Sequence, residues 1–293
     1  MPPHSGRWLG AMSGWGGDLA GVLAAALAAA LIVTGGCFGA AAQEAQPRPP
    51  ASACDGEIIG RGAASRVVDG RTLVLADARE VRLAAIEVPP LAQEPAAAPG
   101  GAAARDALAD LLAGAQIVLR QAEPQKIDRY GRIVAYVFAA REGGERLLQA
   151  ELLSAGAARV AARVGNRGCA AELLQREDAA RRAKLGLWAA SYYDLLDADN
   201  PADVLARLGH FALVEGKVVS VRESGATIYV NFGRRWSTDF TVTILKRNAR
   251  NFTAAGLEPQ KLAGRRVRVR GWIEERGGPW IEAARPEQIE VRE

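Results

Sequence analysis

The side chains best suited to chemistry lie between positions 69 and 132, where arginines and carboxylates interrupt apolar runs. The stretch VDGRT carries Asp69 and Arg71, VRLAAIEVP carries Arg82 and Glu87, and DRYGR ends in Arg132. A guanidinium is a fork of donors that suits phosphate oxygens, and carboxylates are the usual ligands of Ca²⁺. Because a cation on an apolar strand is unfavourable to bury without a partner, Arg82 is either an anion ligand or a residue on the wet face of a half-exposed strand.

Other kinds of site find less support. The chain has two histidines, of which His4 lies in the N-terminal leader-like segment and His210 stands alone. Ser-His-Asp and Cys-His hydrolysis are therefore unsupported. The formal net charge is +4, from 37 basic and 33 acidic residues. This mild excess is compatible with a polyanionic partner but does not by itself indicate one.

Short strands, a long loop and helices must position these residues. Apolar runs broken by turns predict strands, Asp-Gly predicts a tight turn at Asp69, and PPLAQEPAAAPGG predicts a loop over 89–101. Helical spacing that ends near glycine predicts helices. The predicted strands are Ser65–Val68, Thr72–Leu75, Glu80–Ala85, Gln116–Arg120 and Ile133–Ala139, and the predicted helices are Ala102–Ala113, Leu147–Ala155 and Ala170–Leu185.

The C-terminal third is predicted to be mostly β. Its predicted strands are Ala212–Arg222, Thr227–Phe232, Phe240–Leu245, Arg266–Ile273 and Trp280–Ala284, with a short helix over Asn248–Gly256. Five strands with a helix between the third and fourth is the element order of an OB-fold, a small β-barrel. Arg266, Arg268 and Arg270 alternate on the fourth strand and Trp272 follows on the same face, which suits nucleic acid or an ordinary outer face.

The order of VDGRTL, VRLAAIEVP, a Pro/Gly loop with a helix, DRYGRIVAYVF, LLSAGAARV and AELLQREDAARRAKLGLW resembles the staphylococcal-nuclease-like (thermonuclease) family. The resemblance spans nearly all of 65–188. It implies an α+β fold that is mainly β: a five-stranded OB-type barrel capped by three helices, here followed by a second small OB-like barrel. It also implies a Ca²⁺-dependent nuclease that cleaves DNA and RNA phosphodiester bonds.

The resemblance assigns roles to individual positions. Two family arginines that grip phosphate match Arg82 and Arg132, and both are present. The first acid of the turn matches Asp69, which in the family lies near the metal. The carboxylate ligand at the end of the third strand matches Glu87, a longer acid than the usual Asp. Arg82, Arg132 and Glu87 are therefore the carried-over catalytic positions, and Asp69 and Glu87 are the candidate metal ligands.

Two other family positions carry the wrong chemistry. The main turn ligand falls on Arg71, and the acid that activates water falls on Pro90, although Glu94 in the same loop offers a replacement base. A cation beside a divalent ion weakens metal binding, and proline is no general base. In one interpretation Arg71, Arg82 and Arg132 form an anion pocket. In the other, Arg71 replaces the metal and forms internal ion pairs with Asp69 and Glu87, which stabilise a site without activity.

The N-terminus is expected to direct export to the periplasm or envelope. Residues 21–33 are apolar and Ala40-Ala41-Ala42 offers a cleavage site, so 1–42 is interpreted as a signal peptide. Lipidation at Cys37 and an uncleaved membrane anchor stay open. In an oxidising compartment Cys54 and Cys169 are expected to form a disulfide, the alternative being two unrelated buried thiols.

The predicted domains are a disordered spacer (43–53), a thermonuclease-like domain (54–190), a linker (191–200) and an OB-like domain (201–293). The leading hypothesis is an exported thermonuclease-like protein with a degenerate site that binds single-stranded DNA or RNA or another polyanion. One alternative is an active Ca²⁺-dependent phosphodiesterase with a rearranged site, which needs Ca²⁺ as its cofactor. The other is a structural envelope module for protein contacts. Contact with the membrane is expected only through the N-terminus.

Overall fold

The structure is a computed structural model that describes residues 52–91 and 98–292. The predicted leader (1–42), most of the predicted spacer and Glu94 lie outside the described residues. Residues 47–293 form a compact unit of their own. None of the helices in the described ranges combines the length and the apolar character needed to cross a bilayer.

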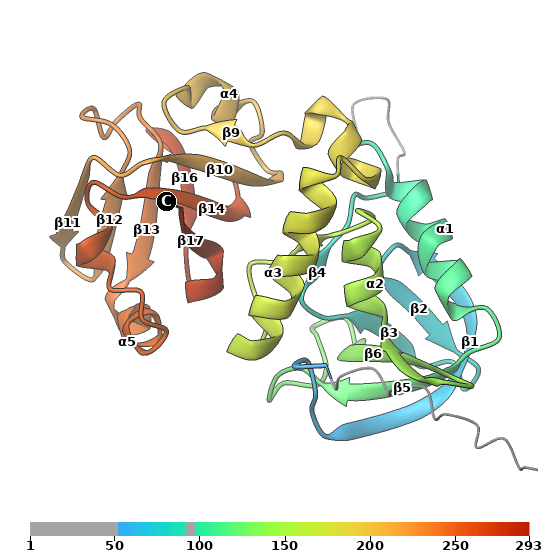
Figure 1. The fold of residues 1–293 in the computed structure, drawn as a ribbon. Coiled ribbons are helices and arrows are strands. Elements are labelled where there is room, and N and C mark those ends of the chain that lie inside the picture. Colours follow the sequence, from blue (N-terminus) through green and yellow to red (C-terminus); the bar gives the residue numbers. More distant parts are fainter. Residues whose placement is uncertain (1–51, 92–97, 293) are drawn as a thin grey trace, which may run out of the picture. The chain divides into compact units, whose positions relative to one another are not determined.

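The first half of this unit is built on a sheet that returns on itself (Figure 1). Its strands are β1 (Ile58–Asp69), β2 (Thr72–Leu75), β3 (Glu80–Leu83), β5 (Gln116–Gln121), β6 (Ile133–Arg141) and β7 (Gly144–Leu147), and a short β4 (Ile86–Glu87) pairs with β8 (Arg159–Val160). The order is β3-β2-β1-β5-β6-β7, and β3 also pairs with β6. Strands β1, β2, β3, β6 and β5 therefore form a closed ring of pairings around a core that contains Leu73, Val81 and Leu83.

Strand β1 is much longer than the predicted Ser65–Val68. Its first part pairs with β5, from Ile58 opposite Arg120 to Ala63 opposite Gln116, and its second part pairs with β2. The prediction relied on apolar side chains, whereas the added residues are held by backbone hydrogen bonds that any sequence can make.

The predicted helices are present with shifted ends. They are α1 (Gly101–Leu112), α2 (Leu148–Ser154) and α3 (Arg167–Arg182). Helix α1 buries Ala104, Leu108 and Leu112, which the helical period places on one face. Helix α3 begins three residues before the predicted Ala170, because the side chain of Asn166 accepts the Cys169 N–H at 2.7 Å and caps it.

The disulfide between Cys54 and Cys169 is formed. It joins the residues that precede β1 to the first turn of α3, and both cysteines are fully buried. The bond therefore fixes the start of the chain's first strand to a helix 115 positions further along.

The second half contains two sheets, in the orders β17-β14-β10-β9 and β11-β12-β13-β16-β15. Their strands are β9 (Leu196–Asp197), β10 (Phe211–Lys217), β11 (Ser220–Ser224), β12 (Thr227–Asn231), β13 (Thr241–Leu245), β14 (Arg266–Trp272), β15 (Glu274–Arg276), β16 (Gly278–Glu282) and β17 (Ile289–Arg292), with the helices α4 (Pro201–Leu205) and α5 (Lys246–Ala254). The single strand predicted over 212–222 is two strands, β10 and β11, in different sheets. Across the described ranges no strand pairing joins the two sheets, so a closed OB-type barrel stays a prediction here.

Short 3-10 turns complete the chain: η1 (Gly186–Ala189), η2 (Ser191–Tyr193), η3 (Pro259–Leu262) and η4 (Pro286–Gln288). The segment predicted as a linker, 191–200, thus contains η2 and strand β9, which pairs with β10. Tyr193 is buried, and its hydroxyl donates to the Pro99 carbonyl at 2.5 Å. The α+β class, mainly β, is confirmed by these elements.

Candidate functional site

The turn between β1 and β2 places Arg71 where its side chain reaches strand β4. The Asp69 carboxylate accepts the backbone N–H of Arg71 at 2.8 Å, which fixes the turn. The Arg71 guanidinium donates to the Ile86 carbonyl at 3.2 Å and forms an ion pair with the Glu87 carboxylate. The side chains of Arg71 and Glu87 are only 16% and 15% exposed. Both predicted metal-ligand carboxylates are therefore engaged, Asp69 by the backbone and Glu87 by a cation.

Arg82 lies in the middle of β3 and joins this cluster from the adjacent strand. Its register partners are Thr72 on β2 and Val134 on β6. Arg71 is the residue just before Thr72, so it lies next to the position opposite Arg82. The side chain is half-buried, and in the described ranges it makes neither an ion pair nor a side-chain hydrogen bond. Burial first, and then the charges of Arg71 and Arg132, lower the pKa of Arg82 against the opposing effect of Glu87 and Asp69. Arg82 is thus a partly desolvated cation that feels the repulsion of Arg71 and Arg132.

Arg132 is also close, but it is held by its own loop. Its Nε donates to Asp128 at 2.8 Å, and its backbone N–H donates to the same carboxylate at 3.1 Å. The guanidinium carbon lies 4.9 Å from the centre of the Tyr130 ring. Burial alone would raise the pKa of Asp128, but the hydrogen bonds from Arg132 and the loop backbone lower it. The DRYGR loop therefore holds Arg132 in place with its charge partly balanced.

The acidic side chains of this arrangement do not gather into one cluster. In the described part of the chain, no group of three or more His, Cys, Asp or Glu side chains is placed to share a metal ion. Calcium takes six to eight oxygen ligands, usually with several carboxylates among them. Here one oxygen of the Glu87 carboxylate is paired with Arg71, whose positive charge lies beside this acid.

Pro90, at the position expected for the general base, lies at the surface after β4. Its carbonyl oxygen approaches α1 so closely that a Cβ at Gly101 would be 2.1 Å away. The backbone of Pro90 therefore packs directly against the first residue of α1, Gly101. A proline has no group that accepts a proton from water.

Arg159 was missed by the sequence reasoning although it adjoins the site. It pairs with Glu87 in the register of β4 and β8 and is 7% exposed. It donates to the Phe211 carbonyl at 2.6 Å and lies 5.0 Å from the ring centres of Tyr193 and Phe211. Burial is the largest influence and lowers its pKa. The signal that singled out Arg82, an arginine in an apolar run, is also present in LLSAGAARV.

Two of the three arginines of β14, Arg268 and Arg270, do not line an open surface. Arg268 and Arg270 are 5% and 1% exposed, because their face packs against α3. Arg270 donates to Glu177 at 2.9 Å through two nitrogens and to Glu290 at 2.7 Å. For Arg268 and Arg270 the predicted nucleic-acid surface and the predicted outer face are therefore both wrong. The alternation of arginine and valine places these side chains on one side of the strand, but it does not determine what covers that side.

Comparison with protein-family models matches residues 80–190 to the family described as Staphylococcal nuclease homologue. The matched range contains Arg82, Glu87 and Arg132, and it begins after the turn that carries Asp69 and Arg71. No curated protein matches the sequence.

Proposed function

Starting from a staphylococcal nuclease homologue domain at residues 80–190, we propose that this protein binds single-stranded nucleic acid and has lost Ca²⁺-dependent cleavage. The observation that carries the proposal is the ion pair between Arg71 and Glu87. Under this proposal the Arg71 guanidinium takes the position that the family resemblance gives to a metal, and Arg82 lies on the neighbouring strand β3.

The loss of cleavage rests on two independent changes. A unit charge pair at ~4 Å is worth about 4 kcal/mol at an effective dielectric near 20, and the repulsion between Arg71 and a divalent ion is larger. Loss of a general base, as at Pro90, lowers a rate by about 10²- to 10⁴-fold. Either change alone weakens a nuclease, and together they remove both the metal and the activated water.

Retention of phosphate binding is supported by Arg82. Arg82 is half-buried and feels the charges of Arg71 and Arg132 as well as those of Glu87 and Asp69, and their net effect with burial disfavours its positive charge. An anion that reaches it would offset this desolvation and repulsion. A phosphodiester oxygen pair matches the guanidinium fork. The nearby Tyr130 ring is 66% exposed and adds an aromatic surface beside the cations.

We further propose that the protein is exported, that 54–190 and 201–293 are separate OB-type domains, and that 1–42 is the leader. A disulfide in the described chain supports an oxidising compartment. The mass of the native protein tests the leader: cleavage after Ala42, lipidation at Cys37 and retention of the whole segment give different masses.

The experiment compares the unmodified protein with the double variant Arg71→Asp with Pro90→Glu, on end-labelled single-stranded DNA and RNA with Ca²⁺ or chelator. We expect salt-sensitive binding without cleavage by the unmodified protein, and Ca²⁺-dependent cleavage by the double variant. Arg79→Asp makes the same charge change in the neighbouring turn, where Arg79 pairs with Asp77 at 2.7 Å, and is the matched control.

Two outcomes would contradict the proposal. Chelator-sensitive cleavage by the unmodified protein would mean that the site is an active phosphodiesterase with another base, for which Glu94 is the candidate. Absence of both cleavage and binding would favour a structural module of the envelope that acts through protein contacts.

A further inference from the structure

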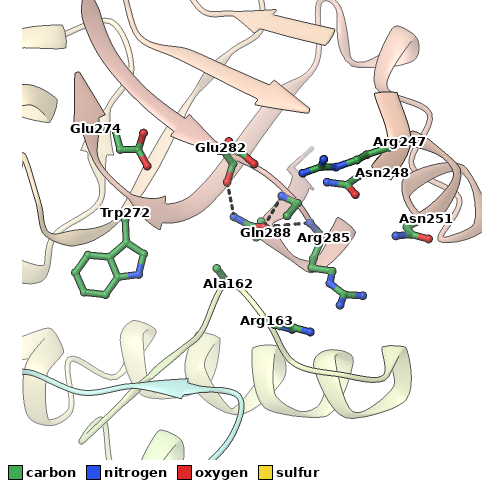
Figure 2. A pocket seen from close by; sticks show the side chains of 11 residues that line it. Ala162, Arg163, Arg247, Asn248, Asn251, Trp272, Glu274, Glu282, Arg285 and Gln288 are labelled. Atoms are coloured by element: carbon green, nitrogen blue, oxygen red, sulfur yellow. Dashed lines mark hydrogen bonds between the residues drawn. The ribbon is translucent and has the colours of Figure 1, made fainter. Parts of the chain in front are cut away.

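A polar pocket lies within the unit and shares no residue with the cluster around Arg82. Its volume is about 470 Å³, within the range of about 300–1,000 Å³ of small-ligand sites. It is lined by the loop after β8 on one side and by α5, the end of β14 and the segment before η4 on the other (Figure 2).

Cationic side chains without acidic partners face this pocket. Arg247 on α5 and Arg285 before η4 form no ion pair with any described residue, whereas Arg163 is paired with Glu123. Arg285 is half-buried, so its charge is partly desolvated. Asn248 and Asn251 lie on α5 with Arg247 and add amide donors and acceptors. An anionic group in the pocket would therefore meet unbalanced charge and further hydrogen-bonding groups.

An aromatic surface lies in the same pocket. The indole of Trp272, at the end of β14, is 49% exposed. One side of the ring is supported by Phe211, whose ring centre lies 6.0 Å away in an edge-to-face arrangement. Figure 2 shows Trp272 on one side of the pocket and Arg247, Asn248 and Asn251 on the other. The supported, half-exposed ring offers a planar ligand a stacking surface.

The wall that carries Arg285 is rigidly held. Gln288 is 2% exposed, and its side-chain oxygen accepts the N–H groups of Ala284 at 2.8 Å and Arg285 at 3.1 Å. Its amide nitrogen donates to the carbonyls of Arg270 and Glu282. The backbone of Arg285 is thereby fixed before any ligand arrives, which lowers the conformational cost of binding.

We propose that this pocket binds a nucleotide, with its base on Trp272 and its phosphate at Arg247 and Arg285. The acids of the lining favour a nucleotide over a simple anion. Glu274 pairs with Arg276 at 3.4 Å on the surface, and Glu282 has no cationic partner in the described ranges. A free carboxylate repels inorganic phosphate, but it accepts hydrogen bonds from sugar hydroxyls or the amino group of a base. The inference is separate from the proposed function, because it concerns different residues.

The test is a calorimetric titration of the full chain with adenosine 5′-monophosphate, and in parallel with inorganic phosphate. We expect saturable binding of the nucleotide and none of phosphate at the same concentrations. Arg247→Gln with Arg285→Gln, and separately Trp272→Leu, should each weaken binding roughly tenfold or more, in line with single phosphate contacts and single-base stacking. Trp272→Phe should retain most of the affinity.

Controls separate this site from the cluster around Arg82. Arg250→Gln removes an exposed arginine of α5 that does not line the pocket, and should leave the affinity unchanged. No saturable binding, equal loss in Arg250→Gln, or full affinity in both the Arg247→Gln with Arg285→Gln variant and the Trp272→Leu variant would overturn the proposal. The last result would mean that the nucleotide binds outside this pocket. Circular dichroism of each variant confirms that it is folded.

Discussion

The most demanding test of the packing between α3 and β14 is the substitution Arg270→Met. Arg270 is 1% exposed, and its guanidinium binds Glu177, whose side chain is 3% exposed, and Glu290, whose side chain is 17% exposed. Burial by itself would lower the pKa of Arg270, but the charges and hydrogen bonds of Glu177 and Glu290 raise it, so the residue stays protonated. Methionine fills a similar volume and supplies no charge.

The expected magnitude follows from the partners that are left behind. The substitution removes donors at 2.9, 2.9 and 2.7 Å and leaves two carboxylates close together in a dry interface. Removing one partner of a buried ion pair costs about 3–5 kcal/mol. In a domain of this size 1 kcal/mol shifts Tm by about 2–4 °C, so we expect a fall in Tm of about 6–20 °C.

Thermal unfolding followed by circular dichroism at neutral pH measures this shift. Adding Glu177→Gln to Arg270→Met removes the stranded charge and should recover part of the loss. The matched control is Arg105→Met, since Arg105 pairs with Asp106 at 2.8 Å but is 43% exposed, and should change stability by less than about 1 kcal/mol. An Arg270→Met variant as stable as Arg105→Met would refute the buried contact between α3 and β14.

Three further results are expected. The first concerns acid stability. Burial by itself would raise the pKa of Asp178, but Arg181 lowers it below 3.8. Burial would also raise the pKa of Glu215, but Arg266 and Arg268 lower it below 4.5. Their contribution is therefore complete above about pH 5 and is lost as the pH falls through the folded values; Asp178→Asn should flatten the decline in Tm below about pH 5. For the disulfide, Cys54→Ser with Cys169→Ser opens a long loop and should cost about 2–4 kcal/mol, measured by urea unfolding; an unchanged midpoint would contradict this. For nucleic acid, Arg82→Gln should weaken single-stranded DNA about 10- to 100-fold and make the salt slope shallower by about 0.7, in filter binding; an unchanged slope would exclude Arg82 from the contact.

Much of the local structure follows from the sequence, with errors of a consistent kind. Strand β2 was predicted with its observed bounds, and helices α1, α2 and α3 were predicted with shifted ends. The start of β1 and the break between β10 and β11 were missed. These features depend on which backbone segments pair, and a hydrophobic pattern does not record that.

The candidate site divides in the same way. The sequence singled out Arg82 because a charged group in an apolar run needs a partner, and the resemblance to the nuclease family added Arg71, Glu87 and Arg132 as candidate site residues. It left open whether Arg71 pairs with Asp69 or Glu87 or faces an anion. Only the fold decided that Arg71 reaches Glu87 while Asp69 holds the turn backbone.

The arginines of β14 make the physical reason plain. Alternation in the sequence determined that Arg266, Arg268 and Arg270 share one face of a strand. Only the tertiary structure decided that α3 covers Arg268 and Arg270 and leaves Arg266 at the edge. The period of a strand is a local property of the backbone. The partner of a buried charge, by contrast, can lie on a distant segment of the chain: Glu177, which pairs with Arg270, is 93 positions away from it.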